Sequence, residues 1–174
     1  LTAGADGTVR VWDVSTGTEL AVWRGHLDAV NDVALSPDGR LAATASAHRT
    51  VRIWNVASAL QVCRFDGHKG WVLRAAFSPD AQQVLSISRD GGLMLWDSTH
   101  AYVLLNDPRA RASSAAFSPD GTALMAGARD GTLRQWDLAT GDIRVETRIH
   151  RARISRIAFA SGGDLLLTTS YDGT

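Results

Sequence analysis

The spacing of four tryptophans constrains the fold of this chain more than any other feature of its sequence. These residues stand 42, 42 and 40 positions apart, and they are Trp12, Trp54, Trp96 and Trp136. Each ends a strand-like run: DGTVRVWD at 6–13, HRTVRIWN at 48–55, DGGLMLWD at 90–97 and DGTLRQWD at 130–137. YDGT at 171–174 matches the opening of a fifth run. Self-similarity at a fixed period indicates an internal repeat with a unit of about 40 residues.

A turn motif recurs in step with the tryptophans. It reads SPDG at 36–39, SPDA at 78–81 and SPDG at 118–121, with a degraded ASGGD at 160–164. Because Pro presets φ and Gly accepts a positive φ, each motif predicts a tight turn. Within one unit, segments with β character lie at 30–35, 41–46, 51–54 and 60–65. Each unit therefore predicts four short strands, and helical periodicity is sustained nowhere.

A four-stranded unit of this size cannot bury both of its faces alone. Neighbouring units must stack, and radial stacking into a propeller protects the strand edges. We therefore predict an all-β fold, a β-propeller of four-stranded antiparallel blades over residues 1–174. The chain holds about four blades' worth of sequence: a partial blade at 1–24, blades at about 25–66, 67–106 and 107–148, and a partial blade at 149–174.

Three markers in phase resemble the WD-repeat family over the whole chain. A Gly-His pair recurs at Gly25-His26 and Gly67-His68, a turn Asp at Asp6, Asp90, Asp130 and Asp172, and a closing Trp-Asp at Trp12-Asp13, Trp96-Asp97 and Trp136-Asp137. The resemblance implies a buried hydrogen-bonded chain within each blade, best preserved as His68, Ser88, Asp90 and Trp96. His48 replaces a turn Asp and Pro108 replaces a His. We expect those two blades to be looser.

The number of repeats predicts a fragment of a larger propeller. Propellers have about four to eight blades, so we expect further repeats on one or both sides. The alternative is self-closure, in which the two partial blades complete one another within a chain or between two chains. Residues 1–8 and 166–174 duplicate the same element, which would leave one copy over. The stretch 97–108 is also two residues shorter than 13–26, which predicts an irregular junction between the third and fourth blades.

Composition and charge exclude several classes of partner. Eighteen basic residues balance eighteen acidic ones, so no broad field favours nucleic acid or an anionic membrane. No apolar run reaches the ~20 residues of a spanning helix. Cys63 is the only cysteine, which excludes an intrachain disulfide and favours a reducing cytoplasm. High Ala and Arg with few Lys predict a bacterial source.

No motif in the chain predicts catalysis, a cofactor or a metal site. Phosphate-binding loops of the GxxxxGK[ST] type, GxSxG elbows and HExxH helices are absent from the sequence. His26, His68 and His150 recur at positions that are structural in the family, and no Cys or His pair has zinc spacing. We therefore expect a chain that is not an enzyme. An active site in the central channel would need convergent acids or metal ligands that the sequence does not supply.

Arginines and aromatics supply the candidate binding site. The resemblance places six residues at the family's usual contact positions on the narrow face or in its loops: Trp71, Arg89, Arg111, Arg129, Arg153 and Tyr171. Such a set suits an acidic or phosphorylated peptide, through bidentate contacts and ring stacking, although solvated arginines are the alternative. We therefore expect an interaction scaffold or sensor module that binds a protein or peptide. A self-assembling propeller fragment, whose incomplete terminal blades pair between chains, is the second hypothesis.

Overall fold

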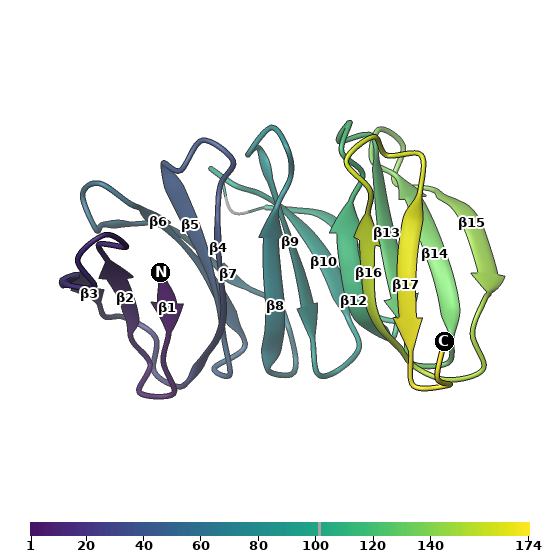
Figure 1. Ribbon diagram of the computed structural model, residues 1–174, viewed down its shortest axis with the longest axis horizontal. Helices are drawn as coiled ribbons and strands as arrows, with labels where there is room; N and C mark the ends of the chain where they lie inside the picture. The colour runs from purple at the N-terminus through teal and green to yellow at the C-terminus, as the bar shows by residue number, and fades with distance from the viewer. Residues whose placement is uncertain (101) are drawn as a thin grey trace.

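The computed structural model describes residues 1–100 and 102–174, and within them every regular element is a β-strand (Figure 1). Seventeen strands form five antiparallel sheets in chain order. The first sheet contains β1 (Thr2–Ala3), β2 (Val9–Trp12) and β3 (Glu19–Trp23). The second contains β4 (Val30–Leu35), β5 (Leu41–Ser46), β6 (Thr50–Asn55) and β7 (Gln61–Asp66). The all-β class and the meander of four strands per unit are confirmed.

The remaining sheets repeat this pattern. The third contains β8 (Val72–Phe77), β9 (Gln83–Ser88), β10 (Leu93–Asp97) and β11 (Val103–Asp107). The fourth contains β12 (Ala112–Phe117), β13 (Ala123–Ala128), β14 (Thr132–Asp137) and β15 (Ile143–Arg148). The fifth has two strands, β16 (Ile154–Phe159) and β17 (Leu166–Ser170). No helix in the described residues is long and apolar enough to cross a bilayer.

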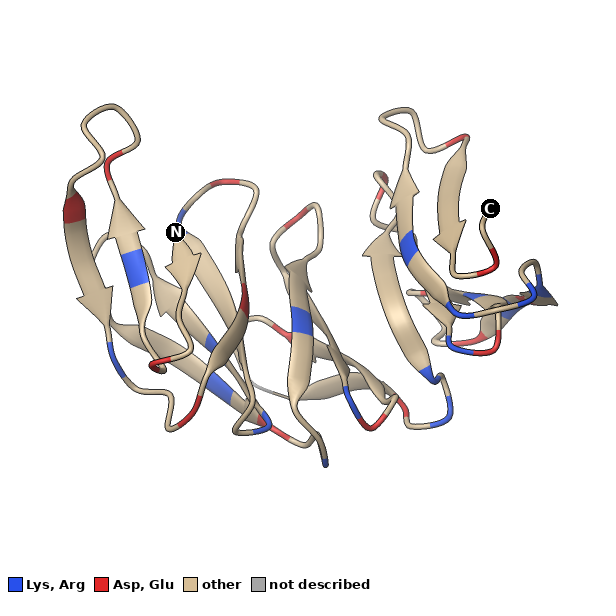
Figure 2. Cartoon of the chain, turned by 60° about the horizontal axis from the view of Figure 1, so that its bottom comes forward, with Lys and Arg blue, Asp and Glu red and all other residues tan. Residues whose placement is uncertain are grey.

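The five sheets stand side by side in an open arc, as a partial propeller. Figure 1 shows the first sheet at one end of the row and the fourth and fifth sheets together at the other, and Figure 2 shows the row curving with the two chain ends apart. The first four sheets also share a bulge: the pairing of their last two strands shifts just before Trp12, Trp54, Trp96 and Trp136. A bulge at one fixed place bends each sheet in the same way.

The second strand of each complete sheet is the most enclosed. β13 is buried over its whole length, and β5 and β9 are buried except at their first residue. Small residues allow this crowding, because a Cβ added at Gly127 would collide with the side chain of Ile154 in the neighbouring sheet. By contrast β17, which has no third strand beside it, leaves alternate residues exposed. Burial of the second strand therefore depends on completion of its sheet and on its neighbour.

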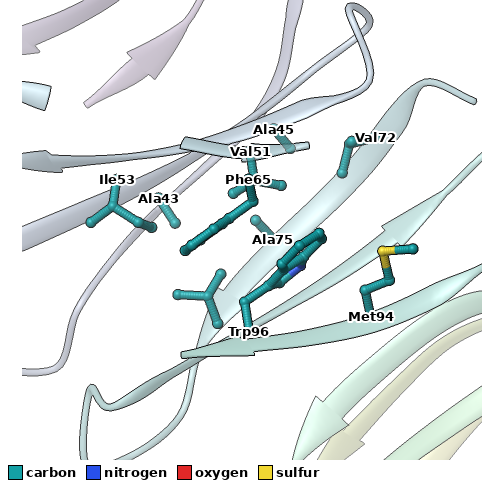
Figure 3. Packing of buried hydrophobic residues seen from close by; sticks show 10 residues of the cluster. Ala43, Ala45, Val51, Ile53, Phe65, Val72, Ala75, Met94 and Trp96 are labelled. Carbon is teal, nitrogen blue, oxygen red and sulfur yellow. The ribbon is translucent and has the colours of Figure 1, made fainter. Parts of the chain in front are cut away.

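The hydrophobic core lies between sheets, and aromatic stacking joins the first three. Trp23 of β3 stacks on Trp54 of the second sheet, with ring centroids 5.7 Å apart. Phe65 of β7 stacks on Trp96 of the third sheet at 5.0 Å, and Figure 3 shows these two rings among the buried side chains of both sheets. Offset stacking adds ~1 kcal/mol to the burial of such rings. The outer strands β3 and β7 thus each cover the tryptophan of the sheet that follows.

The stacking stops at the junction of the third and fourth sheets. Asp107 of β11 pairs with Leu93, and Phe65 of β7 pairs with Val51, so the two residues occupy equivalent positions. The third sheet therefore has a carboxylate where the second sheet has an aromatic ring. Its Oδ1 accepts a hydrogen bond from the Arg109 amide at 2.8 Å, within the connection to β12. Trp136 is instead covered by aliphatic residues that include Leu105 and Ala110. The irregular junction expected from the shorter stretch 97–108 is confirmed.

Truncation of Phe65 tests the contact between sheets. We expect Phe65→Ala to lower the free energy of unfolding by about 3–5 kcal/mol, because it removes a buried ring and uncovers Trp96. Urea unfolding followed by tryptophan fluorescence measures this change. Val62→Ala lies on the same strand, where Val62 is 48% exposed, and should cost less than ~1 kcal/mol. Equal losses in the two variants would contradict this account of the core.

Candidate functional site

A buried hydroxyl joins a histidine to the tryptophan of the same sheet. In the second sheet, Thr44 Oγ1 lies 2.7 Å from His26 Nε2 and accepts a hydrogen bond from Trp54 Nε1 at 2.8 Å. The third sheet repeats this arrangement with Ser86, whose Oγ lies 2.7 Å from His68 Nε2 and accepts from Trp96 Nε1 at 2.7 Å. Buried hydrogen-bond networks of this kind stiffen a fold, because losing one member leaves the others without a partner.

The structure corrects the predicted membership of this network. The hydroxyl that links His68 to Trp96 belongs to Ser86, not to Ser88. Residues two apart in a strand share a face, so both serines are buried and only the register separates them. Ser88 lies beside the turn, where its Oγ accepts from the Asp90 amide at 3.4 Å. One signal in the sequence could have found Ser86: a hydroxyl residue stands ten positions before the tryptophan in the first three repeats.

The direct histidine–aspartate contact also lies elsewhere than predicted. Asp90 Oδ2 accepts from the amides of Lys69 and Gly70 at 2.8 and 2.9 Å, and the buried Nδ1 of His68 has no hydrogen-bond partner within the described residues. The contact forms in the last sheet, where His150 Nδ1 lies 3.1 Å from Asp172 Oδ2. The third-sheet aspartate therefore ties down its loop through backbone amides rather than through the imidazole.

Burial keeps the network histidines neutral. It lowers the pKa of His26 to about 4, with the charges of Arg52 and His48 acting in the same direction. It also lowers the pKa of His68, although the Asp90 carboxylate opposes it. Burial acts to raise the pKa of Asp90, but the amides of Gly92 and Lys69 outweigh it and hold that pKa below its usual value. These groups are held in one protonation state near pH 7, as suits a structural role.

The candidate contact residues lie at the opposite end of the strands from the Pro-Asp-Gly turns. We call the six residues Trp71, Arg89, Arg111, Arg129, Arg153 and Tyr171 the arginine rim. The residue after each second strand donates its amide to the carbonyl of the residue before the first strand: Arg89 to Trp71 at 2.8 Å, Arg129 to Arg111 at 3.1 Å and Tyr171 to Arg153 at 3.0 Å. The rim is therefore three side-by-side pairs, one on each of the third, fourth and fifth sheets.

Two of the pairs combine a cation with an aromatic ring. The Arg89 guanidinium lies 4.9 Å from the centroid of Trp71, and that of Arg153 lies 5.8 Å from Tyr171. Trp71 and Tyr171 are 49% and 72% exposed, so their rings remain open to a partner. An open depression of about 510 Å³ adjoins Trp71 and Arg89 and extends to His48 and Arg49 on the second sheet.

The middle pair places two arginines together without an aromatic residue. Arg129 also donates from Nη2 to the carbonyl of Arg89 at 3.1 Å, which connects it to the first pair. In the described part of the chain, no carboxylate lies within 4.0 Å of the guanidinium nitrogens of Arg89, Arg111, Arg129 or Arg153. Figure 2 shows several basic segments in the loops along one edge of the arc, with acidic turns among them, and other basic segments on the strands. The rim therefore offers several guanidinium groups that no internal ion pair occupies.

The described residues show no constellation that suggests other chemistry. Among them, no group of three or more His, Cys, Asp or Glu side chains is placed to hold a metal ion. Cys63 Sγ lies 3.0 Å from the carbonyl of Thr99, and burial raises the pKa of its thiol. A thiol in that state is a poor nucleophile.

Replacement of Ser86 tests the corrected network. We expect Ser86→Ala to destabilise the chain by about 1–3 kcal/mol, because it leaves the Trp96 indole N–H and the His68 imidazole without their shared partner. Ser88→Ala is the matched control and should cost less, because Ser88 makes a single long hydrogen bond. Urea midpoints of the two variants measure the difference, and a larger loss in Ser88→Ala would restore the original assignment.

Acidification tests the buried imidazole of His26. A folded pKa of about 4 lies below the ordinary value of 6.5, so the unfolded chain binds the proton first. The associated stability is present above pH 6.5 and is lost as the pH falls toward 4. We expect this loss to be about 2 kcal/mol, allowing for the partly exposed ring. His26→Gln should show a smaller loss between pH 7 and 4.5, and an unchanged pH slope in that variant would exclude His26 as the cause.

Comparisons with known proteins agree with this architecture. A family model described as the IFT122 first beta-propeller matches residues 1–174. The nuclear distribution protein PAC1 of Coccidioides posadasii (strain C735) is 55% identical over 38 residues, which are 22% of this chain and 8% of that protein. Mouse (Mus musculus) coronin-7 is 49% identical over 39 residues, covering 22% and 4% of the two chains.

PAC1-2 of Uncinocarpus reesii (strain UAMH 1704) is 47% identical over 45 residues, covering 26% of this chain and 10% of that protein. All three matches therefore span about one repeat and a tenth or less of the relative. The match to the family model, unlike these, extends over every sheet of the arc. Through it, the chain belongs to the family of the IFT122 first beta-propeller.

Proposed function

We propose that this chain is a cytoplasmic interaction module that binds an acidic or phosphorylated peptide segment along its arginine rim. A WD-repeat propeller serves in general as a scaffold for protein interactions. The finer proposal depends on one observation: in the described residues, the four rim guanidinium groups have no carboxylate within ion-pair distance.

The middle pair supports an oxyanion as the recognised group. Arg111 and Arg129 stand side by side, because a backbone hydrogen bond of 3.1 Å joins them. Guanidinium groups bind carboxylate or phosphate oxygens in a bidentate manner, which adds direction as well as energy. The flanking Trp71 and Tyr171 rings add exposed apolar area on either side of this charge. Large rings and arginines are the side chains that dominate binding energy at protein interfaces.

Self-assembly is the second candidate, and the exposed strand β17 favours it. In complete sheets the equivalent strands are buried, whereas Leu167 of β17 is 69% exposed and the adjacent Leu165 is 68% exposed. An open edge of this kind can pair with a strand of another chain. A defined dimer whose mass does not change on dilution would support this candidate.

A peptide array tests the proposed function. Short fluorescein-labelled peptides with a central phosphoserine, glutamate or alanine in otherwise randomised sequence are incubated with the chain. We expect the phosphoserine and glutamate sets to be enriched over alanine. Arg129→Ala should weaken the selected peptides about tenfold by removing a charge-assisted contact, with unfolding shifted by less than ~0.5 kcal/mol.

The matched control is Arg40→Ala. Arg40 lies in the Pro-Asp-Gly turn at the other end of the strands, with an exposed side chain, and its removal should leave peptide binding unchanged. Equal binding of the three peptide sets, or equal losses in the two variants, would refute recognition of an acidic segment by the rim.

A further inference from the structure

Polar side chains bridge the first strands of neighbouring sheets at two junctions of the arc. We call these first strands, β4, β8, β12 and β16, the inner strands. Between the second and third sheets, Asn31 donates from Nδ2 to the carbonyl of Val72 at 2.8 Å, and Asp32 Oδ2 accepts from the Ala75 amide at 3.1 Å. Between the fourth and fifth sheets, Ser113 donates to the carbonyl of Ile154 at 2.5 Å, and Ser114 Oγ accepts from the Ile157 amide at 3.1 Å. At both junctions, the second residue of one inner strand donates to the carbonyl of the first residue of the next inner strand. The third residue accepts from the amide of the fourth residue of that next strand.

The junction between β8 and β12 has no such bridge. Leu73 and Arg74 occupy the bridging positions of β8, and the backbone groups at the matching positions of β12 are the Ala112 carbonyl and the Ala115 amide. Unlike β4 with β8 and β12 with β16, β8 and β12 do not pack closely against each other. Ala115 pairs with Ala126 in the same register in which Ala75 pairs with Ser86. Leucine has no polar atom and arginine only donates hydrogen bonds. Neither side chain can therefore accept a hydrogen bond from the Ala115 amide.

A cavity of about 700 Å³ runs along the inner strands from β4 to β16 and includes this junction, and we call it the inner cleft. Leu73, Leu85 and Ile87 supply its apolar lining, and β12 and β16 supply hydroxyl groups opposite. The cleft meets the arginine rim at Arg153 and Tyr171, which line both.

Positive charge predominates around the inner cleft. Arg74, Arg153 and Arg156 line it, and Asp32 is its one carboxylate among the described residues. Asp32 Oδ1 lies 3.9 Å from Arg74 Nη1, while its Oδ2 is already engaged with the Ala75 amide. The described structure places no carboxylate within 4.0 Å of the Arg156 guanidinium nitrogens. The cleft therefore combines guanidinium groups in excess of carboxylates with the Ala115 amide, for which β8 supplies no hydrogen-bond acceptor.

We propose that the inner cleft binds the carboxylate of an acidic side chain from a partner's peptide segment. Asp32 shows the geometry within this chain, since its carboxylate accepts from a strand amide and lies beside an arginine. The partner's carboxylate does the same one junction later: it accepts from the Ala115 amide and pairs with Arg74 and Arg156. Leu73 and Leu85 contact the aliphatic part of the bound side chain. This inference rests on the proposed function only in that the ligand belongs to a protein.

Nuclear magnetic resonance of the ¹⁵N-labelled chain tests the cleft with a defined probe, N-acetyl-glutamate N-methylamide. We expect saturable shifts of the Ala115 amide and of the Arg74 and Arg156 Nε resonances. The equivalent blocked glutamine should bind about tenfold more weakly, because it lacks the charge. Arg156→Gln should weaken the glutamate probe by a similar factor, whereas Arg156→Lys should keep part of the binding.

A double variant supplies the decisive control. Leu73→Asn with Arg74→Asp places the Asn31–Asp32 pair on β8 and puts a carboxylate in the cleft in place of the Arg74 guanidinium. Because the charge at that position is reversed, the glutamate probe should no longer bind. Equal shifts from blocked glutamate and glutamine, or an unmoved Ala115 amide in the titration, would overturn the proposal. Arg129→Ala should leave this titration unchanged, so failure of the rim and failure of the cleft are distinguishable.

Discussion

The structure depends on the contact between one sheet's outer strand and the central tryptophan of the next. The four clusters of buried apolar residues each combine side chains from two neighbouring sheets. A single sheet would expose one face of its tryptophan, so it is stable only beside its neighbours. The residue that the outer strand supplies to this contact changes along the chain. Trp23 and Phe65 stack on the next tryptophan, whereas Asp107 stands at the same position of β11 and makes no aromatic contact. The inner cleft includes that same junction, where the aromatic stacking of the outer strand and the polar bridge between inner strands are both missing.

The polar network shows how a repeat can lose two members of an interaction together. In the fourth sheet, Ala126 stands at the position of Thr44 and Ser86, and the connection before it contains no histidine. Removing one member of a buried pair costs the desolvation of the other, whereas removing both can be nearly neutral. Trp136 remains 2% exposed there, packed among aliphatic side chains instead. The missing hydroxyl and the missing histidine are therefore best understood as one coupled change.

The sequence predicted what the repeat period controls and missed what depends on register between distant segments. Strand number, turn positions and the irregular third junction follow from spacing alone, because each is local in the chain. Ser86 and Ser88 share a face of one strand, so only the pairing with β10 shows which reaches Trp96. Asn31 and Asp32 bond to groups 41 and 43 residues away, a relationship that no local pattern contains. The rim residues were identified by resemblance, and their pairing through backbone hydrogen bonds required the structure.

That pairing also explains how one framework can carry different surfaces. The hydrogen bond that joins each rim pair uses only backbone atoms, and Ala47 and Ala29 of the second sheet make it as well, at 2.9 Å. Because the joint does not involve side chains, the paired positions can be two alanines, tryptophan with arginine or two arginines without loss of the fold. Leu73 and Arg74 show the same freedom on an inner strand, since β8 keeps its register with β9 although no bridge joins it to β12. Specific recognition then belongs to the positions where the repeats differ, and the repeated interactions hold those positions in place.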